Sequence, residues 1–131
     1  MFCCFQSSKE YPDTAAALCV SGETLKCKVV KIYDGDTITV ILPFCGRYFM
    51  EKCRIYGIDT PEIKTKNVTE KLNGLSAKEI LSSLIENKYV MIKFMGREKY
   101  GRHLGQITTM DGIDIADYMI KHGHATKYIL K

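Results

Sequence analysis

Two short segments of this sequence bring carboxylates and an arginine to the ends of apolar runs. The first, Asp34 to Thr37, is by itself a tight turn, and Ile38 excludes an EF-hand loop because it stands at an oxygen-ligand position. The second, Arg54 to Glu62, adds a base and further acids. If the two segments pack together, Asp36 and Asp59 can meet, and two carboxylates with a backbone carbonyl and waters suit Ca²⁺. A surface salt-bridge cluster is the alternative for the second segment taken alone.

A third segment, residues 97 to 102, carries a forked cation beside an aromatic ring. The planar guanidinium of Arg102 matches two phosphate oxygens at once. The ring of Tyr100 offers a face on which a base can stack. A charged hairpin tip is the alternative interpretation of this segment.

Predicted strands position the first two segments. Residues 25 to 42 alternate and are rich in Val, Ile and Thr, which predicts two strands joined at Asp34-Gly35. A third strand is predicted over Arg47 to Tyr56. After Thr60-Pro61 the sequence becomes polar and basic past Lys71, which predicts a long surface loop.

Helical spacing and further alternation complete the predicted fold. One helical face is predicted from Ala77, Ile80, Leu81, Leu84 and Ile85. Strands follow over Tyr89 to Phe94 and Leu104 to Thr109, and then a helix over residues 113 to 121, with Asp114 and Gly123 as its caps. This order predicts an α+β chain, with a five-stranded OB-like β-barrel and two or three helices.

Length and composition predict one folded domain. The chain has 131 residues, 46% of them hydrophobic and 26% charged, with a formal net charge of +4, which fits a globular protein and weakly favours anionic partners. Residues 1–22 show no period and end in Ser21-Gly22, so we expect a flexible or loosely packed leader, followed by the domain at residues 23–131.

The cysteines and the apolar runs bear on location. All 6 Cys lie in the first 53 residues without a CxxC pair, and we expect Cys27 and Cys53 to be buried, reduced thiols. No window predicts a membrane span or a secretory signal, so we expect an intracellular, cytoplasmic protein. Lipid anchoring through Cys3 or Cys4 is an alternative that the pattern does not favour, because adjacent cysteines near a terminus are commonly incidental.

In their order along the chain, the runs DGDT, RIYGIDTPE and KYGR resemble the staphylococcal nuclease (thermonuclease) family. The resemblance extends from about Cys27 to Ala125. It implies a five-stranded OB-like barrel and calcium-dependent hydrolysis of phosphodiester bonds in DNA and RNA, leaving 3'-phosphates.

The resemblance also implies roles for particular acidic residues. Asp36 and Asp59 correspond to the calcium carboxylates, with the carbonyl of Thr60 as a further ligand. Glu62 takes the position of the carboxylate that orients or deprotonates the attacking water. Glu98 stands where the family usually has an acid one methylene shorter.

Basic and aromatic residues receive the remaining implied roles. Arg54 and Arg102 correspond to the phosphate-binding pair, and Lys99 and Tyr100 match residues that line the nucleotide pocket. Attack on a phosphodiester adds negative charge at the transition state, and fixed arginine forks stabilise that charge. A water nucleophile needs no 2'-hydroxyl, so both sugars should be accepted.

We therefore expect a monomeric, calcium-dependent, sugar-nonspecific nuclease that acts on single-stranded or frayed DNA and RNA. The alternative is a catalytically inactive OB-type module that binds nucleic acid or protein. Retention of five charged groups that would repel one another without metal and phosphate argues against that alternative. These groups are Asp36, Arg54, Asp59, Glu62 and Arg102.

Overall fold

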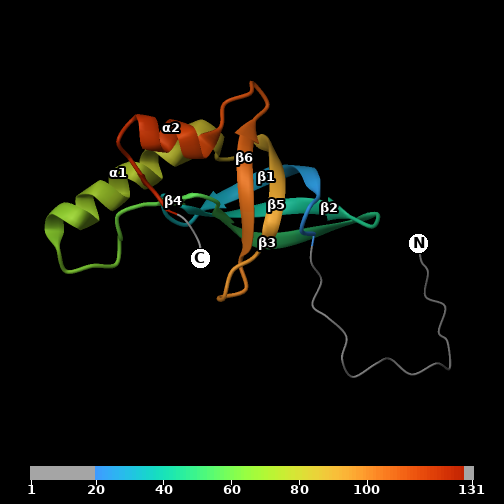
Figure 1. Ribbon diagram of the computed structural model, residues 1–131, viewed down its shortest axis with the longest axis horizontal. Coiled ribbons are helices and arrows are strands. Elements are labelled where there is room, and N and C mark those ends of the chain that lie inside the picture. The colour runs from blue at the N-terminus through green and yellow to red at the C-terminus, as the bar shows by residue number, and fades with distance from the viewer. Residues whose placement is uncertain (1–19, 129–131) are drawn as a thin grey trace.

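A computed structural model describes residues 20–128, and its centre is a closed barrel of five strands (Figure 1). In pairing order the barrel strands are β1 (Thr24–Ile32), β2 (Thr37–Phe44), β3 (Arg47–Ile55), β6 (His103–Thr109) and β5 (Tyr89–Arg97). The β3 and β6 strands pair in parallel, and the other neighbours are antiparallel. The predicted α+β class and the five-stranded OB-like barrel are confirmed.

Side chains that alternate along the strands fill the barrel interior. Side chains that point inward are apolar and buried, whereas their sequence neighbours face outward. They include Cys27, Val29, Ile38, Val40, Leu42, Cys53, Ile55, Val90, Ile92 and Phe94. At Gly105, a Cβ atom would lie 2.6 Å from Ile92 and 2.8 Å from the Cys53 sulfur, so this position of β6 admits only glycine without a shift of its neighbours.

Two helices pack on this barrel. Helix α1 (Val68–Ile85) begins after Asn67, whose side chain accepts the amide of Glu70 at 3.0 Å, and helix α2 (Ile115–Lys121) begins after Asp114. The predicted helical face is confirmed, because Ala77, Leu81 and Ile85 of α1 are buried with Ile80 and Leu84 packed against the core. The predicted surface loop is shorter than expected, since the Asn67 cap starts α1 before Lys71.

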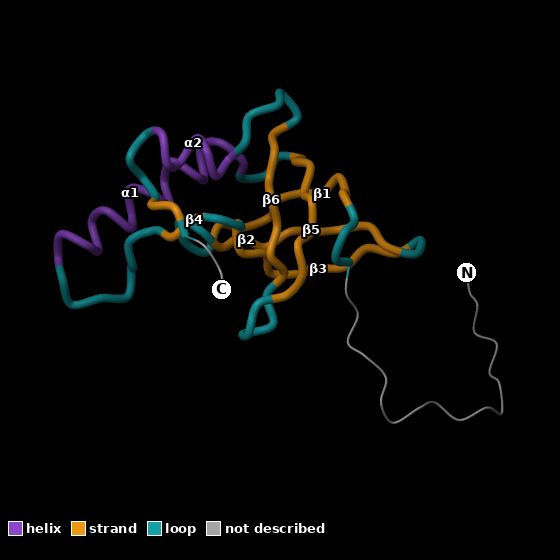
Figure 2. The backbone as a smooth tube through the Cα atoms, viewed as in Figure 1, coloured by secondary structure: helices purple, strands orange, loops and turns teal. Residues whose placement is uncertain are grey.

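A small two-stranded sheet lies beside the barrel and was not predicted. It pairs β4 (Ile58–Asp59) with β7 (Thr126–Lys127) in antiparallel register. Figure 2 shows β4 running into the loop that leads to α1, on the same side of the barrel as both helices. This sheet joins the segment after β3 to the segment after α2.

The segment before β1 contacts the barrel. Val20 is buried in the core, and the amide of Gly22 donates to the carbonyl of Phe94 at 2.8 Å. The last three residues of the predicted leader therefore pack on the domain, and residues 1–19, with Cys3 and Cys4, lie outside the described residues.

Free thiols and helix lengths bear on two further predictions. Cys27 and Cys53 are buried and unpaired, as predicted, and burial raises the pKa of each thiol to about 12. Over residues 20–128, neither helix combines the length and apolar character that crossing a membrane requires.

Candidate active site

Arg54 joins the two aspartates that the sequence singled out. Its Nη2 atom lies 3.5 Å from Oδ2 of Asp36 and 3.4 Å from Oδ1 of Asp59. The guanidinium and Asp36 are mostly buried, whereas the Asp59 side chain is 52% exposed. Charge-assisted hydrogen bonds are commonly shorter, at about 2.8 Å. Arg54 therefore makes only long contacts to both carboxylates.

Close packing of small residues sets the positions of these carboxylates. A Cβ atom on Gly35 would lie 2.9 Å from Ala77 and 3.0 Å from Thr60, so the turn that carries Asp36 lies directly against α1 and the segment after β4. The backbone of Asp36 is fixed as well, because the amide of Ile55 donates to its carbonyl at 2.8 Å. Turn, strand and helix together hold the two aspartates on one face.

Thr37 connects this acidic pair to Arg102. Its hydroxyl donates to Oδ1 of Asp36 at 3.1 Å and accepts from Nη1 of Arg102 at 2.9 Å. Thr37 is itself buried, so this small network is protected from water. Thr37 belongs to the DGDT run, whose spacing alone does not indicate this role.

Glu98 holds Arg102 from the opposite side. Its Oε2 atom accepts Nη2 of Arg102 at 3.0 Å, and its Oε1 atom accepts the backbone amides of Tyr100 and Arg102 at 2.9 and 3.0 Å. Burial alone would raise the pKa of Glu98, but the hydrogen bonds and charge of Arg102 outweigh burial and lower it. The carboxylate therefore stays charged and fixes the turn from residue 98 to residue 102.

Asp34 adds a third carboxylate beside the aspartate pair. Its Oδ1 atom accepts the amide of Asp36 at 3.1 Å. Burial, and then the hydrogen bond and charge of Asp36, raise the pKa of Asp34 to about 6. The turn therefore places a second, partly buried carboxyl group directly beside Asp36.

Both arginines keep a buried N–H group without a partner. Among the described residues, three buried side-chain polar atoms lack a hydrogen bond, and two of them are Nη1 of Arg54 and Nε of Arg102. Buried donors are almost always paired in native proteins, and exceptions concentrate at functional sites. Two orphaned cationic donors beside one face are suited to an anionic ligand.

Glu62 lies next to this cluster rather than inside its hydrogen-bond network. It shares a hollow of about 380 Å³ with Asp59, Thr60, Glu70 and His124. Its amide donates to Glu70 at 3.3 Å, and its side chain is exposed. Helix α1 supports this segment closely, since a Cβ atom on Gly74 would lie 2.7 Å from the Pro61 carbonyl.

The predicted nucleotide-contacting residues lie on the other side of Arg102. Tyr100 is 73% exposed, and its ring centroid lies 5.1 Å from Nζ of Lys99 and 5.8 Å from the guanidinium carbon of Arg102. Tyr100, Arg102 and Lys52 line a groove of about 390 Å³. The structure thus places an exposed ring at the edge of the arginine site.

Tyr128 covers Arg54 and was missed by the sequence analysis. Its ring centroid lies 5.2 Å from the Arg54 guanidinium carbon, and its amide donates to the carbonyl of Gly57 at 2.8 Å. The β4–β7 pairing brings it there, aided by a hydrogen bond from Thr126 to the Asp59 carbonyl at 3.4 Å. Two-residue strands carry no periodicity, so no sequence pattern indicated this contact.

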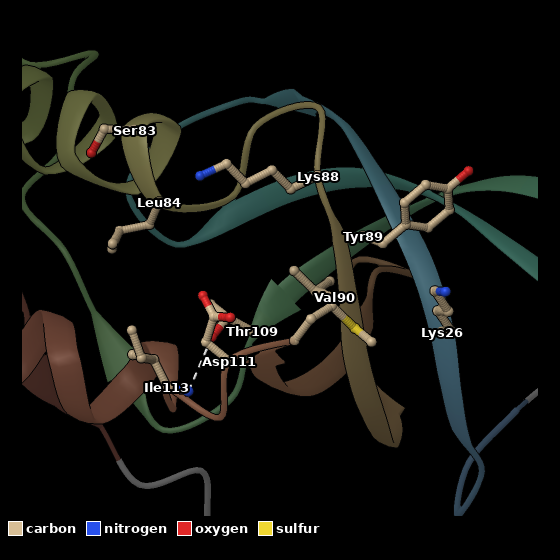
Figure 3. A pocket seen from close by; sticks show the side chains of 10 residues that line it. Lys26, Ser83, Leu84, Lys88, Tyr89, Val90, Thr109, Asp111 and Ile113 are labelled. Carbon is tan, nitrogen blue, oxygen red and sulfur yellow. Dashed lines mark hydrogen bonds between the residues drawn. The ribbon is translucent and has the colours of Figure 1, made fainter.

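A larger cavity, of about 500 Å³, lies elsewhere in the fold (Figure 3). Its lining comes from β1, the end of α1 and the segments around β5 and β6, and includes Lys26, Lys88, Tyr89 and Ile113. Neither the aspartates nor the two arginines of the candidate site line it. The candidate site is therefore distinguished by its orphaned donors and carboxylates and not by the size of its hollow.

The donor set fits a hard cation in part. Asp36 and Asp59 supply carboxylate oxygens near Arg54, and such oxygens are the ligands that Ca²⁺ prefers. Within the described residues, no cluster of three or more His, Cys, Asp or Glu side chains is arranged to hold a metal ion. Backbone carbonyls and waters would have to complete the coordination.

A closed five-stranded barrel, with two arginines and two carboxylates gathered on one face, defines an OB-like protein. Residues 52–131 match the family described as "Staphylococcal nuclease homologue". The chain therefore belongs to the staphylococcal nuclease family. The predicted family resemblance is confirmed.

Similar proteins carry names of the same kind. An "Uncharacterized endonuclease" of Escherichia coli is 32% identical over 101 residues, covering 77% of this chain and 60% of that protein. "Endonuclease YhcR" of Bacillus subtilis is 28% identical over 110 residues, covering 78% of this chain and 9% of that protein. A "Thermonuclease" of Staphylococcus hyicus is 32% identical over 82 residues, covering 61% of this chain and 46% of that protein. The chain spans about 60% of the length of the Escherichia coli relative.

Proposed function

We propose that this chain is a calcium-dependent, sugar-nonspecific nuclease that hydrolyses phosphodiester bonds of DNA and RNA. The observation that carries the proposal is the pair of buried, unpartnered donors on Arg54 and Arg102, next to two carboxylates. A phosphate group accepts hydrogen bonds from both arginines and tolerates a cation on its other oxygens. No neutral ligand uses this combination equally well.

Asp36 and Asp59 would hold the cation, with the carbonyl of Thr60 as a further ligand. A bound Ca²⁺ would neutralise phosphate charge and favour a nucleophilic water. Asp36 is suited to this role because the Thr37 hydroxyl and the Ile55 amide already fix it in place. Asp59 is more exposed, and its backbone is held by the β4–β7 pairing.

The two arginines would bind the scissile phosphate and stabilise charge as it develops. Arg102 is preorganised by Glu98 and Thr37, so little reorganisation is needed when negative charge increases at phosphorus. Arg54 turns from its loose carboxylate contacts toward the phosphate, while Tyr128 limits its exposure to water. The arrangement stabilises the transition state more than the ground state.

Glu62 would orient the attacking water and accept its proton. The carboxylate is exposed in the hollow that it shares with Asp59 and Thr60, so water reaches it readily. Because the nucleophile is water, the reaction does not require a 2'-hydroxyl, and both DNA and RNA are substrates. The family resemblance leads us to propose 3'-phosphate products.

Single-stranded or frayed nucleic acid is the proposed substrate form. The exposed Tyr100 ring beside Arg102 can stack only on a base that is not already stacked within a duplex. We also propose that the protein acts as a monomer in the cytoplasm. The unpaired thiols of Cys27, Cys45 and Cys53 are consistent with a reducing compartment.

Incubation of the purified full chain with single-stranded DNA and RNA, in Ca²⁺ and in chelator, tests the proposal. Cleavage of both polymers in Ca²⁺ and its loss in chelator are the expected results. Glu62→Gln serves as the matched control, because it preserves side-chain size while removing the base. Binding of either polymer without any hydrolysis in Ca²⁺ would instead support the catalytically inactive binding module.

A further inference from the structure

Tyr33 lies immediately before the turn that carries Asp36, and two lysines from other segments lie beside its ring. Tyr33 is 46% exposed. Its ring centroid lies 5.9 Å from Nζ of Lys52 and 5.9 Å from Nζ of Lys64. Lys52 belongs to β3, and Lys64 lies in the loop between β4 and α1. We name this surface of Tyr33, Lys52 and Lys64 the Tyr33 platform.

The Tyr33 platform adjoins the candidate active site. Lys52 and Arg54 flank the buried Cys53, so both side chains leave β3 on its outward face. Lys52 also lines the groove that contains Tyr100 and Arg102. Lys52 thus connects the two exposed tyrosine rings.

Backbone contacts also tie Tyr33 to the arginine network. Its amide donates to the carbonyl of Thr37 at 2.9 Å, and the Thr37 hydroxyl accepts from Arg102 at 2.9 Å. The backbone that carries the ring is therefore tied to the residue that binds Arg102. Tyr33 and Arg102 thus share Thr37 as a direct hydrogen-bond partner.

The chemistry of the Tyr33 platform matches one nucleotide. An exposed aromatic ring stacks on a base of any identity, and lysine ammonium groups neutralise the flanking phosphates. At 5.9 Å, both ammonium groups lie near the outer limit of attraction to the ring, which is about 6 Å. They therefore retain hydrogen-bonding capacity for phosphate oxygens.

We propose that the Tyr33 platform binds a second nucleotide of a single-stranded substrate, beyond the nucleotide held at Tyr100 and Arg102. The proposal rests on the proposed nuclease function. It adds a contact that strengthens binding of substrates longer than one nucleotide. An oligonucleotide engages both rings, whereas a mononucleotide engages only the site at Arg102.

Tyr89 provides a matched control on another part of the barrel. It is 53% exposed, and its ring centroid lies 5.2 Å from Nζ of Lys26 and 5.9 Å from Nζ of Lys28. Figure 3 shows Tyr89 and Lys26 at the edge of the cavity that contains none of the proposed catalytic residues. The two tyrosines share exposure and basic neighbours but differ in location.

The test measures binding in Ca²⁺ by fluorescence anisotropy, with the full chain carrying Glu62→Gln so that the substrate stays intact. The probes are an oligothymidylate of about eight nucleotides, within the site size of OB folds, and a thymidine mononucleotide used as competitor. We expect Tyr33→Ala to weaken oligonucleotide binding by about fivefold or more. Tyr33→Phe should restore binding, Tyr89→Ala should be neutral, and mononucleotide binding should not change.

A second measurement tests the platform without removing the ring. Lys52→Ala and Lys64→Ala should each lower the slope of log affinity against log salt for the oligonucleotide by about 0.7. Lys26→Ala is the matched control and should leave the slope unchanged. These exposed lysines can be replaced without risk to the core, so this measurement decides the question if Tyr33→Ala fails to fold.

Several outcomes would overturn the proposal. Unchanged oligonucleotide affinity in Tyr33→Ala, or equal losses in Tyr33→Ala and Tyr89→Ala, would each do so. An equal loss for the mononucleotide would assign Tyr33 to support of the Asp36 turn instead. If the parent chain binds the oligonucleotide but cleaves nothing before Glu62 is replaced, the proposed nuclease fails while the platform stands. If the parent binds neither probe, both proposals fail.

Discussion

Glu98 binds Arg102 through both of its carboxylate oxygens, one on the backbone amide at 3.0 Å and the other on Nη2 at 3.0 Å. The same side chain thus shapes the turn and aims the guanidinium. In Glu98→Ala we expect kcat to fall by about tenfold or more, because a charge-assisted hydrogen bond contributes about 1.5 to 3 kcal/mol. KM should change little. The kcat of Glu98→Gln should lie between those of the wild type and Glu98→Ala, since glutamine can still accept hydrogen bonds from the backbone amides.

Steady-state kinetics on single-stranded DNA would check this expectation for Glu98. A loss confined to KM would indicate that Glu98 affects substrate capture. Activity of Glu98→Ala at or above that of the wild type would show that the carboxylate competes with the phosphate for Arg102.

Lysine should not perform the function of either Arg54 or Arg102. In Arg54→Lys and Arg102→Lys we expect turnover to fall by about 10² to 10³, because an ammonium group cannot present two coplanar donors to a phosphate. The loss in Arg102→Lys should be mainly in kcat, since Arg102 is already oriented before substrate binds. Single-turnover rates at saturating substrate measure this directly, and normal cleavage by both variants would contradict the assigned roles.

Replacement of Glu62 by glutamine separates binding from chemistry. We expect substrate affinity to survive and the hydrolysis rate to fall by about 10² to 10⁴, the range typical of general-base catalysis. Quenched-flow cleavage together with anisotropy titration measures the two effects. A rate within about threefold of wild type would remove Glu62 from the mechanism.

Gly74 should be needed for both stability and activity. Alanine raises intrinsic helix stability by about 1 kcal/mol at an interior position, but here its Cβ would lie 2.7 Å from the Pro61 carbonyl. We expect Gly74→Ala to destabilise the fold by about 1 to 3 kcal/mol and to shift the segment that carries Glu62. Urea unfolding checks the stability, and Ser76→Ala, at an exposed position of α1, is the control.

Alkaline pH should weaken the fold through the buried thiols. Burial raises the pKa of Cys27 and Cys53 to about 12 in the folded state, above the usual thiol value of 9.0. The stabilisation is complete below the unfolded pKa and is lost as pH rises from about 9 toward 12, because only the unfolded chain releases its thiol protons there. Cys27→Ala should show a shallower fall in unfolding free energy over this range, and parallel curves would contradict the assignment.

Local patterns were sufficient to predict the barrel strands and both helices. Alternation indicated which side chains enter the barrel, and the helical spacing from Ala77 to Ile85 indicated which face of α1 is buried. The start of α1 was missed because the polar residues around Asn67 resemble a loop until the cap is seen. The barrel strands and helices depend on neighbours in sequence, and the errors in predicting them are confined to their boundaries.

Parts of the site could not be predicted, because they depend on contacts between distant segments. Asp36, Arg54 and Asp59 were identified from their motifs, and the structure brings them together. Glu98 was noted only as a departure from the family pattern. The placement of Tyr128 over Arg54 follows from strand pairing between segments that are far apart in sequence, and two-residue strands leave no periodic signal.

The β4–β7 pairing also determines when the site can first exist during synthesis. Asp59 and Arg54 are made early, but the strand that fixes one and the ring that covers the other come from residues 126 to 128. A nascent chain on the ribosome therefore lacks these supports until that segment has left the exit tunnel.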